Sequence, residues 1–211
     1  MKVFRFMGVS LLLLMSSMSA SFGAILNVDN GTLLGASGVS VNGNLYDVSF
    51  QRGSCISLFN GCDEATDFFF TDVGSAAAAN LALLNQVFTD TAEGLFDSNP
   101  SLTNGCDHSF TCSIQTPILL GMASGTVIAS FLRNSAQENL DTHTGVWSNI
   151  GIGADFGTSS YPLYSYALWS GSTSTSVPLP VTIWLFLLGL MGVVLINKNK
   201  VNNRGFLSSV N

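Results

Sequence analysis

Two histidines are the side chains of this sequence best suited to proton transfer at neutral pH, His108 and His143. His108 stands in Asp107-His108-Ser109, which contains the three residue types of a hydrolytic triad. Adjacent residues point apart, however, and a triad is assembled in space rather than along the chain. We therefore interpret both histidines as solvated loop residues and predict no catalytic residue. A secreted hydrolase that uses either histidine with an acid is the alternative.

Acidic side chains gather in one segment of the chain. Asp63, Glu64, Asp67 and Asp72 could supply oxygen ligands to a hard cation such as Ca²⁺. Their spacing matches no EF-hand, so we expect a solvated acidic loop, with no resident metal or cofactor. A Ca²⁺-dependent carbohydrate-binding or adhesin module is the alternative interpretation.

The four cysteines form two close pairs, Cys55 with Cys62 and Cys106 with Cys112. Three connectivities exist for four cysteines, and the short separations favour these two bonds. Both pairs lie in turn-prone sequence, and an even number of cysteines in an exported chain indicates disulfides. A four-thiolate zinc site is the alternative, although no C-x-x-C pair is present.

The elements that must position these residues begin with the segment VSVNGNLYDVSF, residues 39–50. Asn42-Gly43 separates two alternating runs, and Asn-Gly favours a two-residue hairpin turn. With that turn, one face of the predicted β-hairpin carries the larger side chains Val39, Val41, Tyr46, Val48 and Phe50.

The segment AAAANLALLNQVF predicts one main helix over residues 76–89. Alanine and leucine favour helix, and Ser75 is suited to the N-cap position. Leu81, Leu84 and Phe88 would form its apolar stripe.

The remaining segments give weaker signals. Residues 66–72 (TDFFFTD) are a strand candidate, and the segment 91–117 is rich in turn residues and predicts a loop. Residues 118–132 are apolar but broken by glycine, so strand and helix remain open, and YPLYSYALWS (161–170) predicts a final strand. The expected fold class is α+β, a single small domain with an N-terminal β-hairpin and one main helix.

Charge is distributed unevenly along the chain. Only two of the seven cationic residues, Arg52 and Arg133, lie between the terminal segments, whereas all thirteen acids do. The central part therefore carries a net charge of −11, which repels nucleic acid and anionic lipid. We exclude nucleic acid as a partner.

The first residues are typical of an export signal. Lys2 and Arg5 precede an apolar stretch over 6–15, and small residues follow over 16–24. We predict a signal peptide over 1–23, an acidic ectodomain over 24–171 and a Ser/Thr linker over 172–176. An uncleaved N-terminal anchor is the alternative.

The last part of the chain, residues 177–211, contains an apolar core over 181–196 followed by Lys198, Lys200 and Arg204. At about 1.5 Å per residue, a helix of this length spans about 24 Å, enough for a short membrane crossing. The basic residues would stay in the cytoplasm and the ectodomain would lie in the periplasm. We therefore expect a C-terminal transmembrane helix in the inner membrane.

This tail also carries an ordered motif, formed by Val177, Pro178, Leu179, Pro180, Trp184, Gly189, Gly192, Lys198 and Lys200. The order and spacing resemble the VPLPA-type PEP-CTERM sorting domain, which occurs in Gram-negative bacteria that make extracellular polysaccharide. Val181 stands where that family usually has alanine. The resemblance implies processing by an exosortase, a membrane-embedded transpeptidase-like enzyme, and assigns no activity to the ectodomain.

Together these observations predict a non-enzymatic exported protein of the cell envelope or extracellular matrix. It would first be anchored in the inner membrane and then reach the cell surface or the medium after processing. The ectodomain would be a structural or binding module. Its expected partners are the exosortase and the exopolysaccharide matrix.

Overall fold

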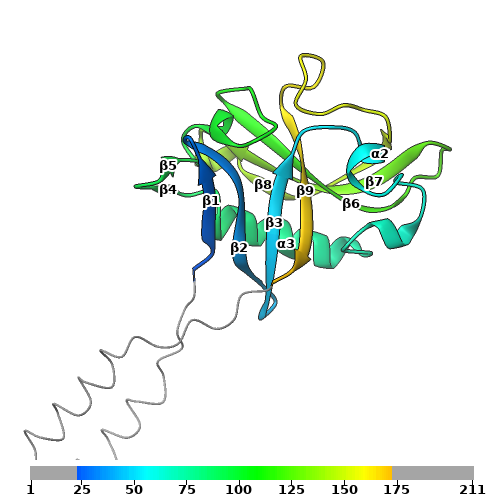
Figure 1. The fold of residues 1–211 in the computed structure, drawn as a ribbon, viewed down its shortest axis with the longest axis horizontal. Coiled ribbons are helices and arrows are strands. Elements are labelled where there is room, and N and C mark those ends of the chain that lie inside the picture. Colours follow the sequence, from blue (N-terminus) through cyan, green and yellow to red (C-terminus); the bar gives the residue numbers. More distant parts are fainter. Residues whose placement is uncertain (1–22, 173–211) are drawn as a thin grey trace, which may run out of the picture. The chain divides into compact units, whose positions relative to one another are not determined.

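The computed structural model describes residues 23–172, so the sorting motif over 177–200 and residues 1–22 of the predicted signal peptide lie outside the described part. The described residues form a curled half-barrel built on a seven-stranded sheet in the order β1-β2-β3-β9-β6-β7-β8 (Figure 1). A two-stranded ribbon, β4-β5, stands beside it. The strands are β1 (Ile25–Asp29), β2 (Thr32–Val41), β3 (Asn44–Gln51), β4 (Asp90–Thr91), β5 (Gly94–Leu95), β6 (Thr111–Leu120), β7 (Thr126–Ser135), β8 (Thr142–Gly151) and β9 (Tyr164–Gly171).

All neighbouring strands of the large sheet are antiparallel except β6 and β9, which run parallel. The last strand of the domain, β9, therefore lies at the centre of the sheet, between β3 and β6. Helix α3 (Val73–Gln86) lies across the strands inside the curl and packs against β2, β6, β7 and β8 (Figure 1). Three short helical turns, α2 (Cys55–Leu58), η1 (Ala65–Asp67) and η2 (Pro100–Leu102), lie in the connections, and η3 (Glu138–Leu140) precedes β8.

The predicted α+β class is wrong, because strands make up 44% of the structure and helices 18%. Strand β6 begins inside the predicted loop 91–117, and the undecided segment 118–132 contributes to the β6–β7 hairpin. These strands carry polar residues that face inward, such as Thr116 and Ser130, so their sequence lacks a clean apolar alternation. Within residues 23–172 no helix has the length and apolar character needed to cross a membrane, and the expected membrane segment 181–196 lies outside that range.

The predicted hairpin is confirmed. Strands β2 and β3 pair antiparallel around Asn42 and Gly43, whose φ angles of 50° and 83° belong to a left-handed two-residue turn. Val39 and Phe50 are fully buried, and Val41 and Val48 nearly so, while Tyr46 packs against the same core. The local turn chemistry therefore set both the register and the buried face.

The predicted helix exists, but its bounds are Val73–Gln86 and not 76–89. Its predicted stripe is only partly right: Leu84 packs against the core and Phe88 is buried just past the helix end. Asp72, rather than Ser75, is the N-cap, and its carboxylate accepts a hydrogen bond of 2.8 Å from the Ser75 backbone N–H. Leu81 is exposed, and the buried face consists of small or polar residues with one leucine: Ala76, Ala79, Asn80, Ala82 and Leu83. Alanine lets the helix approach the sheet closely, which a search for large apolar residues does not detect.

A buried polar network joins this helix to the sheet. The Asn80 amide donates to Ser130 Oγ over 2.9 Å and accepts from Thr116 Oγ1 over 3.2 Å. Thr116 in turn accepts from the Trp169 indole N–H, and Ser130 donates to the Gly145 carbonyl. The network fixes the helix against β6, β7 and β9, because buried polar groups are costly without partners.

The strand candidate over 66–72 is not a strand. The Asp67 carboxylate accepts hydrogen bonds from the backbone N–H groups of Asp63 and Glu64, which folds the segment into the turn η1. Asp72 is likewise committed to the cap of α3. Local side-chain bonds of this kind compete with a strand ladder.

Candidate functional site

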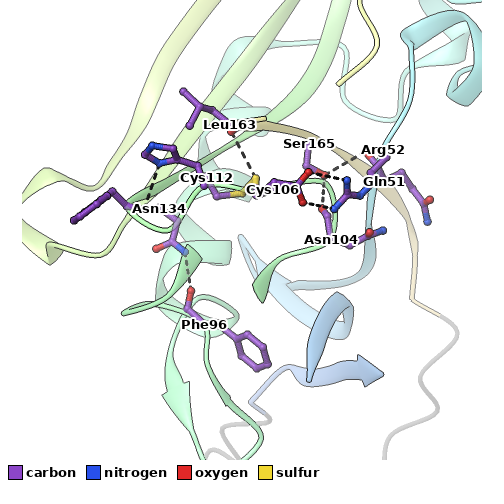
Figure 2. Close-up of a disulfide and its surroundings, with 12 residues drawn as sticks. Gln51, Arg52, Phe96, Asn104, Cys106, Cys112, Asn134, Leu163 and Ser165 are labelled. Atoms are coloured by element: carbon purple, nitrogen blue, oxygen red, sulfur yellow. Dashed lines mark hydrogen bonds and ion pairs between the residues drawn. A yellow bond between two sulfur atoms is a disulfide. The ribbon is translucent and has the colours of Figure 1, made fainter. Parts of the chain in front are cut away.

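The structure confirms the two predicted disulfides, Cys55–Cys62 and Cys106–Cys112. All four cysteines are buried, and within the described residues no cysteine is free. The four-thiolate zinc alternative is therefore excluded. Figure 2 shows the Cys106–Cys112 bond with Asn134, Leu163 and Ser165 around it.

The loop closed by Cys106–Cys112 is held in place by an ion pair. Arg52 donates two hydrogen bonds to the Asp107 carboxylate, at 2.6 and 3.0 Å, and a third to the Gly157 carbonyl at 2.8 Å. The Arg52 guanidinium lowers the pKa of the Asp107 carboxyl through these hydrogen bonds. Asp107 is thus committed to a structural pair and does not orient His108.

The two histidines lie in different surroundings. His108 Nδ1 accepts a hydrogen bond of 3.3 Å from the Phe110 backbone N–H, and its ring packs near the Phe110 ring. His143 lies in a groove of about 530 Å³ between the end of α3 and the start of β8. The structure therefore assembles no Asp107-His108-Ser109 triad.

The groove around His143 is acidic, with Asp90, Asp97, Glu138 and Asp141 in its lining. Burial and the neighbouring charges of Asp90 and Glu138 raise the pKa of Asp97, and burial chiefly raises that of Asp141. Asp90 keeps a lowered pKa because Ser98 donates hydrogen bonds to it. Carboxylates that repel one another could in principle be neutralised by a cation. Among the described residues, however, no group of three or more His, Cys, Asp or Glu side chains is placed to hold a metal ion.

The absence of a metal-holding group among the described residues also applies to the acidic segment 63–72. Hydrogen bonds from the backbone N–H groups of Glu64 and Asp63 lower the pKa of Asp67. Hydrogen bonds from the Ser75 side chain and then its backbone N–H lower the pKa of Asp72. Asp63 and Glu64 lie on the exposed turn beside them. The structure gives the Ca²⁺ alternative no site.

An aromatic cleft of about 410 Å³ lies on another part of the described domain. Its walls come from the 58–70 connection and from β6 and β9. Five rings line it, those of Phe59, Phe68, Phe69, Phe70 and Trp169. Polar groups are contributed by Thr66, Asp67 and Thr116.

The three consecutive phenylalanines reach different environments. Phe68 packs into the smaller core cluster and Phe70 into the larger one, where its ring meets Trp169 edge to face at 5.5 Å. Phe69 is 46% exposed and is held by edge-to-face contacts with Tyr46 and Phe70. Its ring therefore stands at the surface of the cleft on a rigid base.

A cleft of this kind binds ligands that have flat apolar faces and polar edges. Sequence reasoning missed it, because four of its rings come from residues 59–70 but the opposite wall comes from the distant strands β6 and β9. The detectable signal was the run Phe68-Phe69-Phe70 between acids, which we interpreted as a strand.

The predicted sorting residues, from Val177 to Lys200, lie outside the described part of the chain. Searches of protein-family models, curated proteins and solved structures give no match to this chain.

Proposed function

We propose that this is an exported, non-enzymatic protein of the cell envelope or extracellular matrix, whose β-domain binds extracellular polysaccharide in the aromatic cleft. The observation that carries the binding role is the exposed Phe69 ring beside Trp169 and Thr116 in a cleft of about 410 Å³. Sugar rings present C–H faces that pack on aromatic rings, and their hydroxyls suit Thr66 and Asp67.

The proposed route to the envelope depends on the tail. The segment from Val177 to Pro180, with the apolar and basic residues after it, resembles a PEP-CTERM sorting signal. The tail would hold the protein at the inner membrane, with the domain in the periplasm, until an exosortase-type enzyme releases it to the surface or the medium. The two disulfides fit an oxidising compartment outside the cytoplasm.

Binding is tested by affinity electrophoresis of the full-length protein in gels that contain the extracellular polysaccharide of the producing cells. We expect retardation of the wild-type protein and its loss in Phe69→Ala, because that ring is exposed and its removal leaves the core intact. Phe110→Ala is the matched control, since Phe110 is 65% exposed outside the cleft lining. Equal retardation of wild type and Phe69→Ala would refute the role of the cleft.

Sorting is tested separately, by intact-mass analysis of the cell-associated and released forms. We expect the released form to lack the residues after the Pro motif, and Pro178→Ala with Pro180→Ala to accumulate unprocessed protein. A complete C-terminus in both fractions of cells with an active exosortase would refute processing without affecting the binding result.

A further inference from the structure

A second cavity, of about 270 Å³, lies on the face of the sheet opposite α3. It is lined by Ser113, Gln115, Phe131, Arg133, Val146 and Tyr164, none of which lines the aromatic cleft.

Strand register accounts for this grouping. Ser113 pairs with Arg133 and Gln115 with Phe131 across β6 and β7, and Ser113 pairs with Tyr164 across β6 and β9. Paired residues and alternate residues along a strand share a face. The intervening Ile114 and Leu132 point into the core instead, so the polar row is built by the fold itself.

Gln115 is the unusual member of this group. It is fully buried, and both its amide oxygen and its amide nitrogen lack a hydrogen-bond partner among the described residues. Buried amides in folded proteins are nearly always hydrogen-bonded, because an unmade bond is costly. An apolar residue of the same length would fill this position at lower cost, so the amide does not serve the fold.

Arg133 brings a positive charge to the cavity, and no side chain of the described residues pairs with it. It is exposed and makes no ion pair or side-chain hydrogen bond within residues 23–172, whereas Arg52 is committed to Asp107. A guanidinium recognises a carboxylate through paired N–H donors. The lining of the cavity contains no acid, so Arg133 makes it locally suited to an anionic ligand although the domain as a whole is acidic.

Gly145 leaves the space that the Phe131 ring occupies in the wall of this cavity. The Phe131 ring lies against Gly145, where a Cβ atom would come within 2.0 Å of the ring. Tyr164 brings a second ring to the cavity. A sugar ring that carries a carboxylate matches this lining. It offers the rings of Phe131 and Tyr164, the Arg133 guanidinium, the Gln115 amide and the Ser113 hydroxyl.

We infer that the cavity lined by Gln115, Phe131 and Arg133 binds a single uronic-acid sugar residue. Arg133 holds the carboxylate, Gln115 and Ser113 meet hydroxyl groups, and the rings of Phe131 and Tyr164 cover the apolar face of the sugar. The inference rests on the proposed function only for the origin of the sugar, namely acidic residues of the extracellular polysaccharide.

The test is calorimetric titration of the full-length protein, purified in detergent, with galacturonate, galactose and acetate. We expect galacturonate to bind at least about tenfold more tightly than either galactose, which lacks the charge, or acetate, which lacks the ring. Arg133→Gln should weaken galacturonate binding at least about tenfold. Equal affinity in Arg133→Gln and wild type, or no binding of galacturonate, would overturn the inference, and acetate binding as tightly as galacturonate would overturn the sugar assignment.

Gln115→Met separates a binding role from a structural one. We expect weaker galacturonate binding with a melting temperature equal to or above that of wild type, because the amide has no partner to lose. A lowered melting temperature would show that the amide serves the fold and would count against the site. Phe69→Ala should bind galacturonate normally, so failure of the aromatic cleft and failure of this cavity give different results.

Discussion

Asn80 offers the sharpest test of the architecture, because a polar side chain on the buried face of α3 joins the helix to the sheet. In Asn80→Ala, the Thr116 hydroxyl loses its acceptor and Ser130 Oγ loses its donor, while each keeps one other bond. A buried group left unpaired costs about 1–3 kcal/mol. The better helix propensity of alanine returns about 0.5 kcal/mol.

Two groups lose a partner, at about 2–6 kcal/mol together, so the expected net loss is about 1.5–5.5 kcal/mol in the free energy of unfolding. For a domain of this size it corresponds to a fall of about 3–22 °C in melting temperature. Urea unfolding measures it directly, and the m-value should stay unchanged because the surface exposed on unfolding is the same.

Asn85→Ala is the matched control, since Asn85 lies on the exposed face of the same helix and should be neutral or slightly stabilised by substitution. Ser130→Ala combined with Asn80→Ala should cost less than the two single losses added together, because the pair is removed as a unit. A loss below about 1 kcal/mol in Asn80→Ala, or full additivity in the double variant, would refute the reasoning.

Three further predictions follow from the same structure. Replacing Cys106 and Cys112 by serine should lower the free energy of unfolding by about 2–3 kcal/mol, measured in urea without reductant; an unchanged midpoint would contradict it. Asp97→Asn should raise the melting temperature at pH 7, because burial and two neighbouring acids raise the pKa of Asp97 and so penalise its charged form in the folded state. That gain should disappear below about pH 4, where the carboxyl is protonated in both states, and a gain independent of pH would refute the electrostatic cause. Gly105→Ala should unfold at lower urea than Gly125→Ala by an amount equivalent to about 1–3 kcal/mol. Both glycines have positive φ, but only at Gly105 would a Cβ atom meet a neighbour, Ser165 Oγ at 2.4 Å; equal effects would contradict the clash.

The features that were predictable from the sequence are those decided within a few residues. Asn42-Gly43 specifies its turn by backbone preference alone, and the alternating residues beside it then fix the buried face. The two disulfides followed from the short separation of their cysteines. The final strand was visible because Tyr164–Gly171 is rich in residues that favour sheets.

The features that were missed depend on contacts between distant segments. Thr116, Ser130 and Asn134 face inward because other segments supply their partners, such as the Phe96 carbonyl that accepts a hydrogen bond from Asn134. In the sequence alone these residues look like loop or surface positions, so the class was predicted as α+β. Neither cavity could be predicted, since the aromatic cleft needs the 58–70 connection to lie against β6 and β9, and the smaller cavity depends on the register of β6, β7 and β9.

The central position of β9 has a consequence for the order in which the domain can fold. Within the sheet, strand pairing connects β1-β2-β3 to β6-β7-β8 only through β9, the last strand of the domain in the chain. If the chain crosses the membrane N-terminus first, the sheet stays in two separate parts until residues 164–171 have emerged. Such long-range pairing is slow to form. Completion of the domain thus coincides with the arrival of the segment that directly follows β9 in the chain.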